Sequence, residues 1–404
     1  METMISVAQA EGIIKANVSM QPAIDVPFDH IHGHVLREDI AADRDIPPFD
    51  RATMDGIALC VSAWHRGRRE FAVAGVVPAG QAPPALPDDS SCLEIMTGAM
   101  MPEGADCVVR IEDVTIAGPM AKIKESVELE LMKNVHPRGS DCGAGRSLLR
   151  AGTRLLSPQV TIPASTGKTT VTVDKRPRIA IVATGDEIKD VPDDVEIYEI
   201  RQTNTHAMAA GLRNQGYTDV TLHHFRDDSV ALGDGLAVIL DASDVVILVG
   251  GVSMGKFDLV PEVLDELGIT GLFHKVRQRP GKPFWFGVSA AQQPVYALPG
   301  NPVSALIGFH RFILPQLERS AGMEEMCPEC AVLAGAFEFD KPLTYFLPVK
   351  LSFNAKGQRL AIPVHINGSG DFAGLVQSDG FVELDEGKSN FAAGTVVRLF
   401  RWRC

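Results

Sequence analysis

Two segments of the sequence combine glycines with acidic side chains directly after apolar runs that have the composition of buried strands. They are Ala183-Thr-Gly-Asp-Glu187 and Gly250-Gly-Val-Ser-Met-Gly-Lys-Phe-Asp258. Glycines such as Gly250 and Gly251 can adopt positive φ and let backbone N–H groups approach a ligand closely. Ser253 adds a hydroxyl, and a helix expected to start near residue 259 would direct its N-terminus to the same place. Together the two loops predict a site for an anion such as phosphate.

The acids of these loops predict a cation beside that anion. Carboxylates held about 4 Å apart repel by about 4 kcal/mol at an effective dielectric constant of 20. A divalent cation removes this repulsion and can bridge the carboxylates to phosphate oxygens. We therefore predict a Mg²⁺ and phosphate site with Glu187 and Asp258 as metal ligands, joined by Asp227 or Asp228 after the intervening strand. The structural alternative is that each acid only caps the helix that follows it.

Two further turns could supply phosphate ligands. Arg279 and Lys282 bracket a Pro-Gly turn just before a predicted strand, and both cations could face one oxyanion. The segment 297–306, ALPGNPVSAL, leaves a strand through a Pro-Gly-Asn-Pro turn. Pro302 suits the first turn of a helix, for which Asn301 could be the N-cap. Free N–H groups at this turn could equally hold an anion.

The elements that must position these groups alternate between strand and helix from residue 178 to residue 320. Such alternation predicts βαβ units and a parallel sheet, in which ligands bind beyond the carboxyl ends of the strands. Strands are expected at 178–183, 219–225, 244–249 and 294–298, and helices at 205–216, 229–242, 259–268 and 302–320.

The flanking regions are richer in Gly and in short strands. Runs at 71–77, 107–114 and 394–400 are typical of strands, and they favour β-rich domains on both sides of the α/β region. The predicted fold is multidomain: a central parallel α/β domain, a β-rich lid domain and a small C-terminal β-barrel. The expected domains are a discontinuous N-terminal linking domain (1–44 and 136–177), the β-rich domain (45–135), the α/β domain (178–325) and the barrel (326–404).

Composition limits the functional class. The chain has 404 residues, 45% hydrophobic and 22% charged, with a formal net charge of −13. The acidity argues against a nucleic-acid partner, because phosphate backbones require a basic surface. No apolar run approaches the roughly 20 residues that span a bilayer, and no signal-peptide pattern is present. We expect a soluble, cytoplasmic protein whose seven scattered cysteines are reduced.

Two patterns resemble metal sites without completing one. His30, His32 and His34 would share one face of an extended segment, but no fourth ligand accompanies them. Cys327 and Cys330 form a single CxxC without a second pair. An exposed edge and a turn before a new domain are the favoured interpretations.

Six motifs, in order along the chain, resemble the molybdopterin molybdenumtransferase family, which includes MoeA and the C-terminal domain of gephyrin. The resemblance runs from about residue 34 to residue 384 and so covers nearly the whole chain. The motifs are PPFDRATMDGIAL (47–59), MTGAMMPEGADCVV (96–109), ATGDEI (183–188), GGVSMGKFD (250–258), RPGKP (279–283) and LPGNPVSA (298–305).

The resemblance implies a transferase of molybdenum cofactor biosynthesis whose α/β domain is of the molybdopterin-binding type. Such an enzyme inserts molybdenum from molybdate into adenylylated molybdopterin, with Mg²⁺, and releases AMP. It implies a homodimer with a composite active site, and a molybdopterin adenylyltransferase and an apo-molybdoenzyme as possible partners. The residues carried over from the family are Asp55, Thr97, Glu187, Asp227 or Asp228, and Asp258 as catalytic, with Lys282, Pro299 and Pro302. The full predicted set of substrate- or phosphate-binding residues is Gly250, Gly251, Ser253, Arg279, Lys282, Pro299, Gly300, Asn301, Pro302 and Ser304.

Three positions depart from the family pattern. Lys256 stands where an acid usually follows GGVSMG, Gly139-Ser-Asp141 replaces Gly-Glu-Asp, and Ile57 replaces a tyrosine. The charge reversal at Lys256 keeps open a non-catalytic paralogue that binds a molybdopterin species, or a dimeric scaffold. An adenylyltransferase is the weakest alternative, because Gly-Gly-Val-Ser stands in place of its Gly-Gly-Thr-Gly loop.

Overall fold

The computed structural model describes residues 1–252, 259–324 and 327–402. Contacts divide the chain into two compact units. Unit 1 comprises residues 1–38, 151–160 and 170–404, and unit 2 comprises residues 39–150 and 161–169. The four-domain division expected from the sequence stays a prediction.

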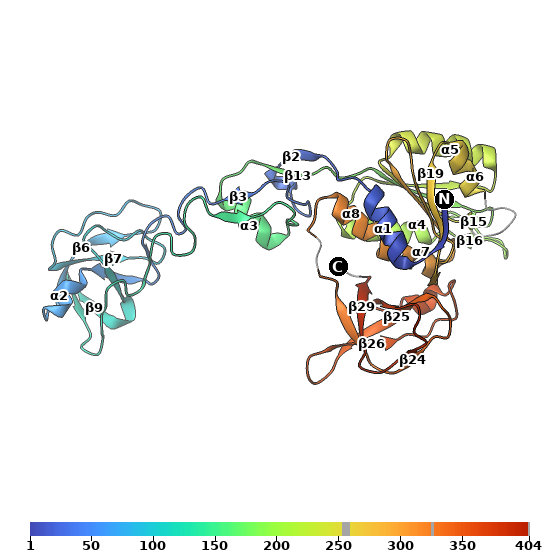
Figure 1. The fold of residues 1–404 in the computed structure, drawn as a ribbon. Helices are drawn as coiled ribbons and strands as arrows, with labels where there is room; N and C mark the ends of the chain where they lie inside the picture. The colour runs from blue at the N-terminus through green and yellow to red at the C-terminus, as the bar shows by residue number, and fades with distance from the viewer. Residues whose placement is uncertain (253–258, 325–326, 403–404) are drawn as a thin grey trace. The chain divides into compact units, whose positions relative to one another are not determined.

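Unit 1 contains a seven-stranded sheet with the order β1-β19-β21-β22-β18-β14-β17 (Figure 1). The four adjacent strands β22, β18, β14 and β17 are parallel, as the alternation of strands and helices predicts. The bounds are β1 Glu2–Ile5, β14 Ile179–Thr184, β17 Val220–Phe225, β18 Val245–Val249, β19 Thr270–Val276, β21 Trp285–Val288 and β22 Pro294–Leu298.

Strand β21 departs from the predicted parallel arrangement, because it is antiparallel to both β19 and β22. Its connections explain the difference. Only residues 289–293 join β21 to β22, and a parallel pair needs a crossover of a dozen residues or more. Strands β1 and β19, which the sequence analysis did not predict, extend the sheet beyond β21 as a parallel pair.

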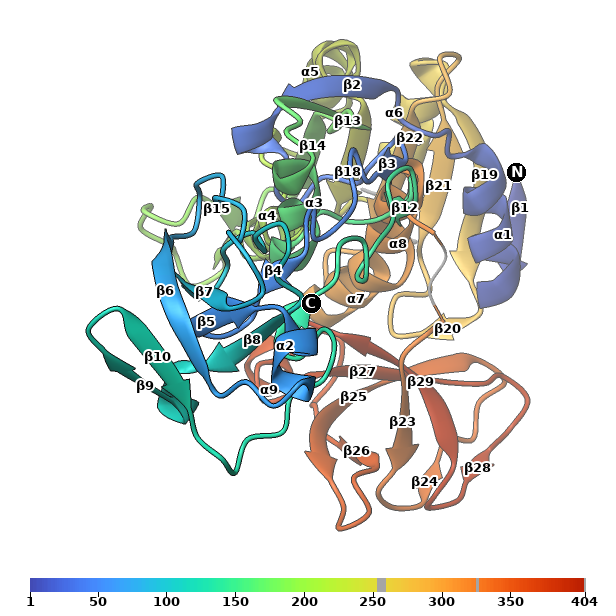
Figure 2. The same cartoon turned by 90° about the vertical axis from the view of Figure 1, so that its left-hand side faces the viewer.

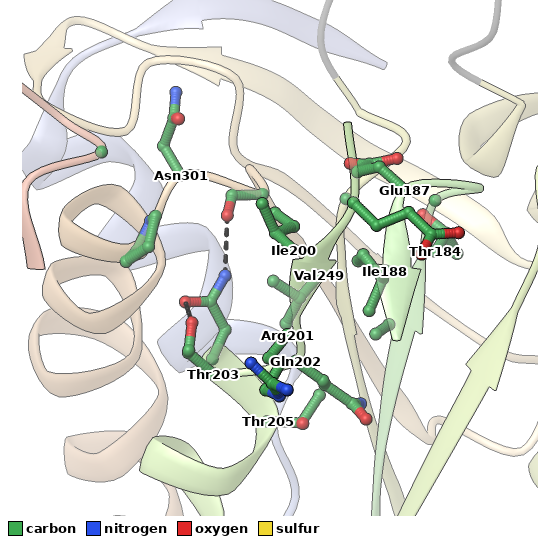
Figure 3. Close-up of a pocket in the computed structure, with 18 of the residues that line it drawn as sticks. Thr184, Glu187, Ile188, Ile200, Arg201, Gln202, Thr203, Thr205, Val249 and Asn301 are labelled. Carbon is green, nitrogen blue, oxygen red and sulfur yellow. Dashed lines mark hydrogen bonds between the residues drawn. The ribbon is translucent and has the colours of Figure 1, made fainter. Parts of the chain in front are cut away.

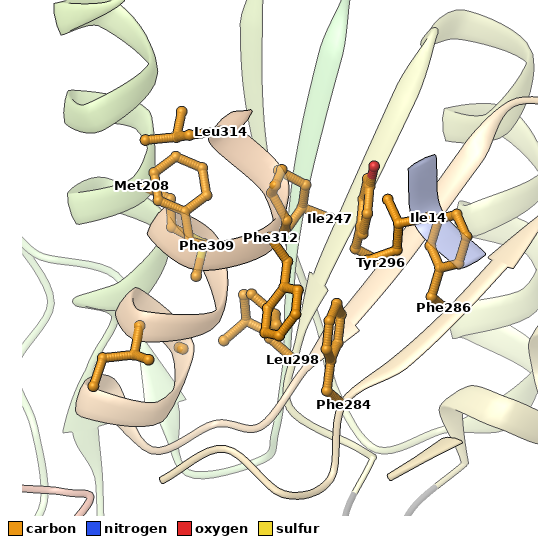
Figure 4. Packing of buried hydrophobic residues seen from close by; sticks show 14 of the residues in the cluster. Ile14, Met208, Ile247, Phe284, Phe286, Tyr296, Leu298, Phe309, Phe312 and Leu314 are labelled. Carbon is orange, nitrogen blue, oxygen red and sulfur yellow. The ribbon is translucent and has the colours of Figure 1, made fainter. Parts of the chain in front are cut away.

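Helices cover both faces of this sheet. Consecutive residues of a strand point to opposite faces, so Ile181 packs in one buried cluster and Val182 in another. The cluster of Ile181 includes residues of α1 (Val7–Asn17), α4 (Asn204–Asn214) and α7 (Pro302–Gly308). The cluster of Val182 includes residues of α5 (Ser229–Ala242) and α6 (Val260–Glu266). Figure 4 shows part of the first cluster, where Phe309 and Phe312 pack near Leu298 and Phe284.

The helix predicted over residues 302–320 contains an interruption. The helix α7 leads into a π-helical turn, η3 (Phe309–Ile313), and then into α8 (Leu314–Ser320). Pro315 has no backbone N–H and cannot donate to a carbonyl one turn earlier. A π-turn is one way in which a helix accommodates such a break in its hydrogen bonding.

The C-terminal part of unit 1 contains a closed five-stranded barrel, as predicted (Figure 2). Its strands follow the order β25-β26-β23-β29-β27, and β27 pairs again with β25 to close the ring. The bounds are β23 Cys330–Leu333, β25 Thr344–Phe353, β26 Arg359–Pro363, β27 Gly380–Leu384 and β29 Val396–Arg401, with β20 (Gln278–Arg279) added alongside β25 and the short pair β24 (Phe337–Glu338) and β28 (Asn390–Phe391).

Unit 2 contains a six-stranded sheet with the order β8-β5-β7-β6-β10-β9. The strand predicted over 107–114 is divided, because the chain turns at η2 (Ile111–Asp113) between β8 and β9. The bounds are β5 Gly56–Leu59, β6 Glu70–Val77, β7 Ser91–Ile95, β8 Cys107–Arg110, β9 Val114–Ala117 and β10 Met120–Ile123, with the short strands β3 (Ile40–Ala41), β4 (Arg51–Ala52), β11 (Val135–His136) and β12 (Ser147–Leu149) and the helix α2 (Val61–His65).

Candidate functional site

The carboxyl ends of β14, β17, β18 and β22 lead into loops that border one cavity of about 770 Å³ (Figure 3). The strands are neighbours in the sheet and run in the same direction, so their ends meet at one edge. The loops are also joined laterally. Gly185 N–H donates to Phe225 O at 3.2 Å, and Gly250 N–H donates to Leu298 O at 2.9 Å. This is the edge at which an open α/β sheet is expected to bind a ligand.

Seven of the predicted site residues line this cavity. They come from all four strand ends, so residues more than 100 positions apart in the sequence share one surface. They are Glu187, Asp227, Gly250, Gly251, Gly300, Asn301 and Pro302.

The glycines at the strand ends are required by their backbone. Gly250 has φ +106°, and a Cβ added to it would lie 2.5 Å from the carbonyl oxygen of Thr184. Gly185 has φ +146°, and its Cβ would lie 2.7 Å from Glu187 Oε2. A side chain at Gly250 would overlap the backbone of Thr184, and one at Gly185 would displace the Glu187 carboxylate, which borders the cavity. The glycines therefore keep the neighbouring loops close enough to form one site.

The structure separates the two adjacent acids that the spacing could not distinguish. Asp228 is the N-cap of α5, and its side chain accepts a hydrogen bond from Ala231 N at 2.8 Å. Asp227 lines the cavity, and its backbone N–H donates to Asp186 Oδ1 at 3.4 Å. Asp228 thus has the helix-capping role that was the structural alternative, whereas Asp227 borders the cavity.

Asn301 occupies the N-cap position of α7, but its side chain makes no capping hydrogen bond. It lines the cavity instead. The neighbouring turn is held from another helix, because Asn204 Nδ2 donates to Gly300 O at 2.7 Å. Pro299 and Ser304, from the same motif, are buried and do not line the cavity.

Arg279 and Lys282 also lie outside the cavity lining. Arg279 belongs to β20, which pairs with the barrel strand β25, and Lys282 is exposed in the turn that follows. A Cβ added to Gly281 would lie 3.4 Å from Ser304 O, so this turn packs against α7. The predicted residues Ser253 and Asp258, and the divergent Lys256, lie outside the described residues.

The sequence analysis missed several polar residues of the cavity. Thr184, Gln202 and Thr205 line it, and each is buried. The Oγ1 atoms of both threonines and Nε2 of Gln202 have no hydrogen-bond partner within the described part of the chain. A polar run between a strand and a helix, RQTNTH (201–206), was the available signal. Such buried groups require a polar ligand or water as partner.

A second omission comes from the barrel. Gly370 and Phe372 line the cavity, although they follow the α/β region by about 50 residues. Phe372 is the first residue of the short helix α9 (Phe372–Leu375), between β26 and β27. No local pattern in the sequence connects this segment with the strand ends.

Asp55 and Thr97 lie together in unit 2, at the ends of β5 and β7. The Thr97 backbone N–H and hydroxyl both donate to Asp55 Oδ1, at 2.6 and 2.7 Å. These two hydrogen bonds stabilise the carboxylate and lower the pKa of Asp55 below its ordinary value. The resemblance pairs these two motifs functionally, and the structure pairs the two side chains.

The histidine cluster does not form a metal site. His30 lies in a 3₁₀ turn, η1 (Phe28–His30), so the segment is not extended as that site would require. His34 contacts the buried carboxylate of Asp174 at 3.1 Å. Across residues 1–252, 259–324 and 327–402, no group of three or more His, Cys, Asp or Glu side chains is placed to hold a metal ion. In the same residues, no helix is both long enough and apolar enough to cross a membrane.

Three family profiles match consecutive parts of the chain. They are described as the MoeA N-terminal region, domains I and II (residues 5–167), a probable molybdopterin-binding domain (180–319), and the MoeA C-terminal region, domain IV (330–402).

Full-length relatives carry one common name. The chain is 40% identical over 400 residues to a molybdopterin molybdenumtransferase of Synechocystis sp., with 99% of this chain and all of that protein covered. It is 31% identical over 405 residues to the molybdopterin molybdenumtransferase of Staphylococcus epidermidis, with 98% and 95% covered. A solved structure of a molybdopterin biosynthesis MoeA protein from Pyrococcus horikoshii matches with a TM-score of 0.81 and 29% identity, covering 99% of this chain and 100% of that chain.

Proposed function

The chain belongs to the molybdopterin molybdenumtransferase family, and from this premise we propose that it inserts molybdenum from molybdate into adenylylated molybdopterin with Mg²⁺-dependent release of AMP. Family membership makes it a transferase of molybdenum cofactor biosynthesis. The observation that carries the finer proposal is the cavity at the strand ends. It brings two carboxylates, Glu187 and Asp227, together with the glycine turns at Gly250 and Gly300.

The glycine turns suit the phosphate part of the substrate. Gly250 and Gly251 both have positive φ and line the cavity without side chains, so a ligand can approach the backbone closely. The chain is acidic overall, so an anionic substrate must be held by local groups of this kind rather than by a global field. Asn301 and Asn204 border the same cavity and add amide groups that donate and accept hydrogen bonds.

The residues present fit a Mg²⁺ ion that shares its ligands with the substrate. Mg²⁺ prefers oxygen ligands and is usually held by one or two carboxylates, several waters and substrate phosphates. Glu187 and Asp227 supply two carboxylates at the cavity, and the described residues contain no larger cluster that would form an all-protein site. When bound, Mg²⁺ would neutralise negative charge on the phosphates. Asp258, the other predicted metal ligand, lies outside the described residues.

The protein's own contribution is then mainly positioning and charge stabilisation. Release of AMP breaks a phosphoanhydride P–O bond while the oxygen of a water molecule forms the new bond to phosphorus, and negative charge develops on the phosphate oxygen that leaves. The backbone N–H of Gly250 is bonded to Leu298 O, so it is the backbone N–H of Gly251 that could donate to a phosphoryl oxygen, while Glu187 and Asp227 would hold the cation. We propose the homodimer and the catalytic roles of Asp55 and Thr97 on the basis of the family resemblance.

The test is AMP release from adenylylated molybdopterin by the purified protein, with molybdate and Mg²⁺ each present or omitted. We expect release that requires both, and we expect Glu187→Gln and Asp258→Asn to abolish most of it. Unchanged release in both variants would contradict the assigned roles. Tight nucleotide binding without release would instead support a non-catalytic paralogue, and Lys256→Glu would then be the variant to make.

A further inference from the structure

Phe372 is an aromatic side chain at the cavity that the proposed chemistry does not use. It begins α9 in the loop between β26 and β27, lines the cavity and is 54% exposed. Other phenylalanines of the same barrel, such as Phe346 and Phe381, are fully buried. Within the described residues, none of the ring–ring contacts of the barrel includes Phe372.

The loop that carries Phe372 is fixed to the α/β region. Ser369 O accepts a hydrogen bond from Val303 N of α7 at 2.9 Å. Asp371 accepts hydrogen bonds from the backbone N–H groups of Asn367 and Gly374, both at 2.8 Å, and so caps α9. Leu375 is buried in the hydrophobic cluster that also contains Ile181. Because its backbone is held on three sides, Phe372 stays at the cavity without loss of loop entropy on binding.

The rest of the cavity lining indicates which kind of ligand the Phe372 ring would contact. A single exposed phenylalanine is ordinary and by itself implies no ligand. The same cavity, however, is also lined by Thr184, Thr205 and Gln202, whose buried Oγ1 and Nε2 atoms have no partner within the described chain. A ligand that matches both features has a flat apolar face and a polar edge. A planar nitrogen heterocycle has this chemistry, and its face stacks well on an aromatic side chain.

We propose that Phe372 is a specificity residue on which a planar nitrogen heterocycle of the substrate stacks. The inference rests on the proposed function, because adenylylated molybdopterin contains two such rings, adenine and the pterin. Both rings share the chemistry that Phe372 recognises, and the experiment distinguishes them.

Isothermal calorimetry of the full chain with three probes tests the proposal: AMP, ribose 5-phosphate and neopterin phosphate. We expect Phe372→Ala to weaken the binding of one ring-containing probe about tenfold, as loss of a stacking contact does. Ribose 5-phosphate, which has no ring system, should bind Phe372→Ala and the wild type equally. Phe372→Trp should retain the affinity, and Phe372→Leu should lose most of it. Weaker binding of AMP alone would assign adenine, and weaker binding of neopterin phosphate alone would assign the pterin.

Phe353 provides the matched control. It lies in the same barrel, on β25, is 67% exposed and does not line the cavity. Phe353→Ala should leave the affinity for all three probes unchanged. Equal affinities of Phe372→Ala and Phe353→Ala for the probes would overturn the proposal. An altered sedimentation coefficient of Phe372→Ala would also overturn it, because it would indicate that the side chain packs against another copy of the chain.

The outcomes for Phe372 and for the proposed function are separable. Wild-type protein that releases AMP while Phe372→Ala binds all probes normally would retain the function and reject the stacking role. Wild-type protein that releases no AMP but loses ring affinity in Phe372→Ala would retain the stacking role and reject the transferase reaction.

Discussion

The side-chain amide of Asn204 donates a 2.7 Å hydrogen bond to the carbonyl oxygen of Gly300. Asn204 is the first residue of α4, and Gly300 lies in the turn between β22 and α7. The bond therefore joins two loops of the cavity that are 96 residues apart in the sequence. The next residue of this turn, Asn301, lines the cavity, and its side chain makes no capping hydrogen bond.

Asn204→Ala should loosen this turn without disturbing the fold. Loss of one hydrogen bond of this kind costs about 1 kcal/mol, so we expect kcat/KM for AMP release to fall about fivefold. Asn214→Ala is the control, because Asn214 is the exposed last residue of the same helix. Steady-state kinetics of both variants checks the expectation, and an equal effect of the two substitutions would contradict it.

Substitution of Asp227 should mainly lower activity, and substitution of the adjacent Asp228 should mainly lower stability. Asp227→Ala removes a carboxylate from the cavity, and we expect AMP release to fall on the order of 100-fold with little change in stability. Asp228→Ala removes the cap of α5 and should lower the free energy of unfolding by about 1 kcal/mol with little loss of activity. Urea denaturation followed by the fluorescence of the buried Trp285, together with the AMP assay, measures both effects. The reverse pattern would reassign the two residues.

Gly250→Ala should distort the strand ends. The substitution places a side chain at φ +106° and a Cβ 2.5 Å from Thr184 O. Gly268 has φ +77° and no atom within 4 Å of its added Cβ. Gly268→Ala therefore introduces backbone strain without steric overlap. We expect a loss of stability of about 1 kcal/mol for Gly268→Ala and a further 1 to 3 kcal/mol for Gly250→Ala. Equal melting temperatures would show that the loop relaxes freely.

The pair Asp55 and Thr97 predicts a defined pH dependence. The folded pKa of Asp55 is lowered, so its stabilising effect is present above the unfolded pKa and is lost as the pH falls through the folded pKa. Thr97→Val removes the hydroxyl donor but keeps the backbone N–H, and the pKa of Asp55 should rise part of the way to its ordinary value. NMR titration of the Asp55 carboxyl measures this shift. Thr53→Val, at an exposed neighbouring position, should leave the pKa unchanged.

The homodimer proposed from the family predicts complementation between inactive subunits. If one active site draws Asp55 and Glu187 from different subunits, a mixture of Asp55→Asn and Glu187→Gln proteins should form some intact sites. Random reassociation makes about half of the dimers mixed, and each mixed dimer has one intact site, so we expect the mixture to recover about a quarter of the wild-type activity. Each variant alone should remain inactive. Absence of recovery in demonstrated mixed dimers would place both residues within one subunit's site.

Much of the α/β region follows from local sequence. The residues of β14 form a short branched apolar run that is buried on both faces, and α5 begins directly after Asp228, which caps it. Local preferences of this kind also predicted α4 and β22, because the apolar runs of strands and the start and stop signals of helices lie within about ten residues of the sequence. The glycine turns after β14 and β18 were recognisable for the same reason, since φ is a property of single residues.

Only the tertiary structure decided which of these groups share a site. Asp227 and Asp228 are chemically identical neighbours, and the difference between them depends on which carboxylate reaches the end of α5. Arg279 and Lys282 carry suitable charges, yet the pairing of β20 with the barrel keeps both outside the cavity lining. Phe372 reaches the cavity because α9 packs against α7, with Leu375 in the buried cluster that α7 also joins. Strand order and the docking of the barrel depend on burial between distant segments, which local sequence patterns do not encode.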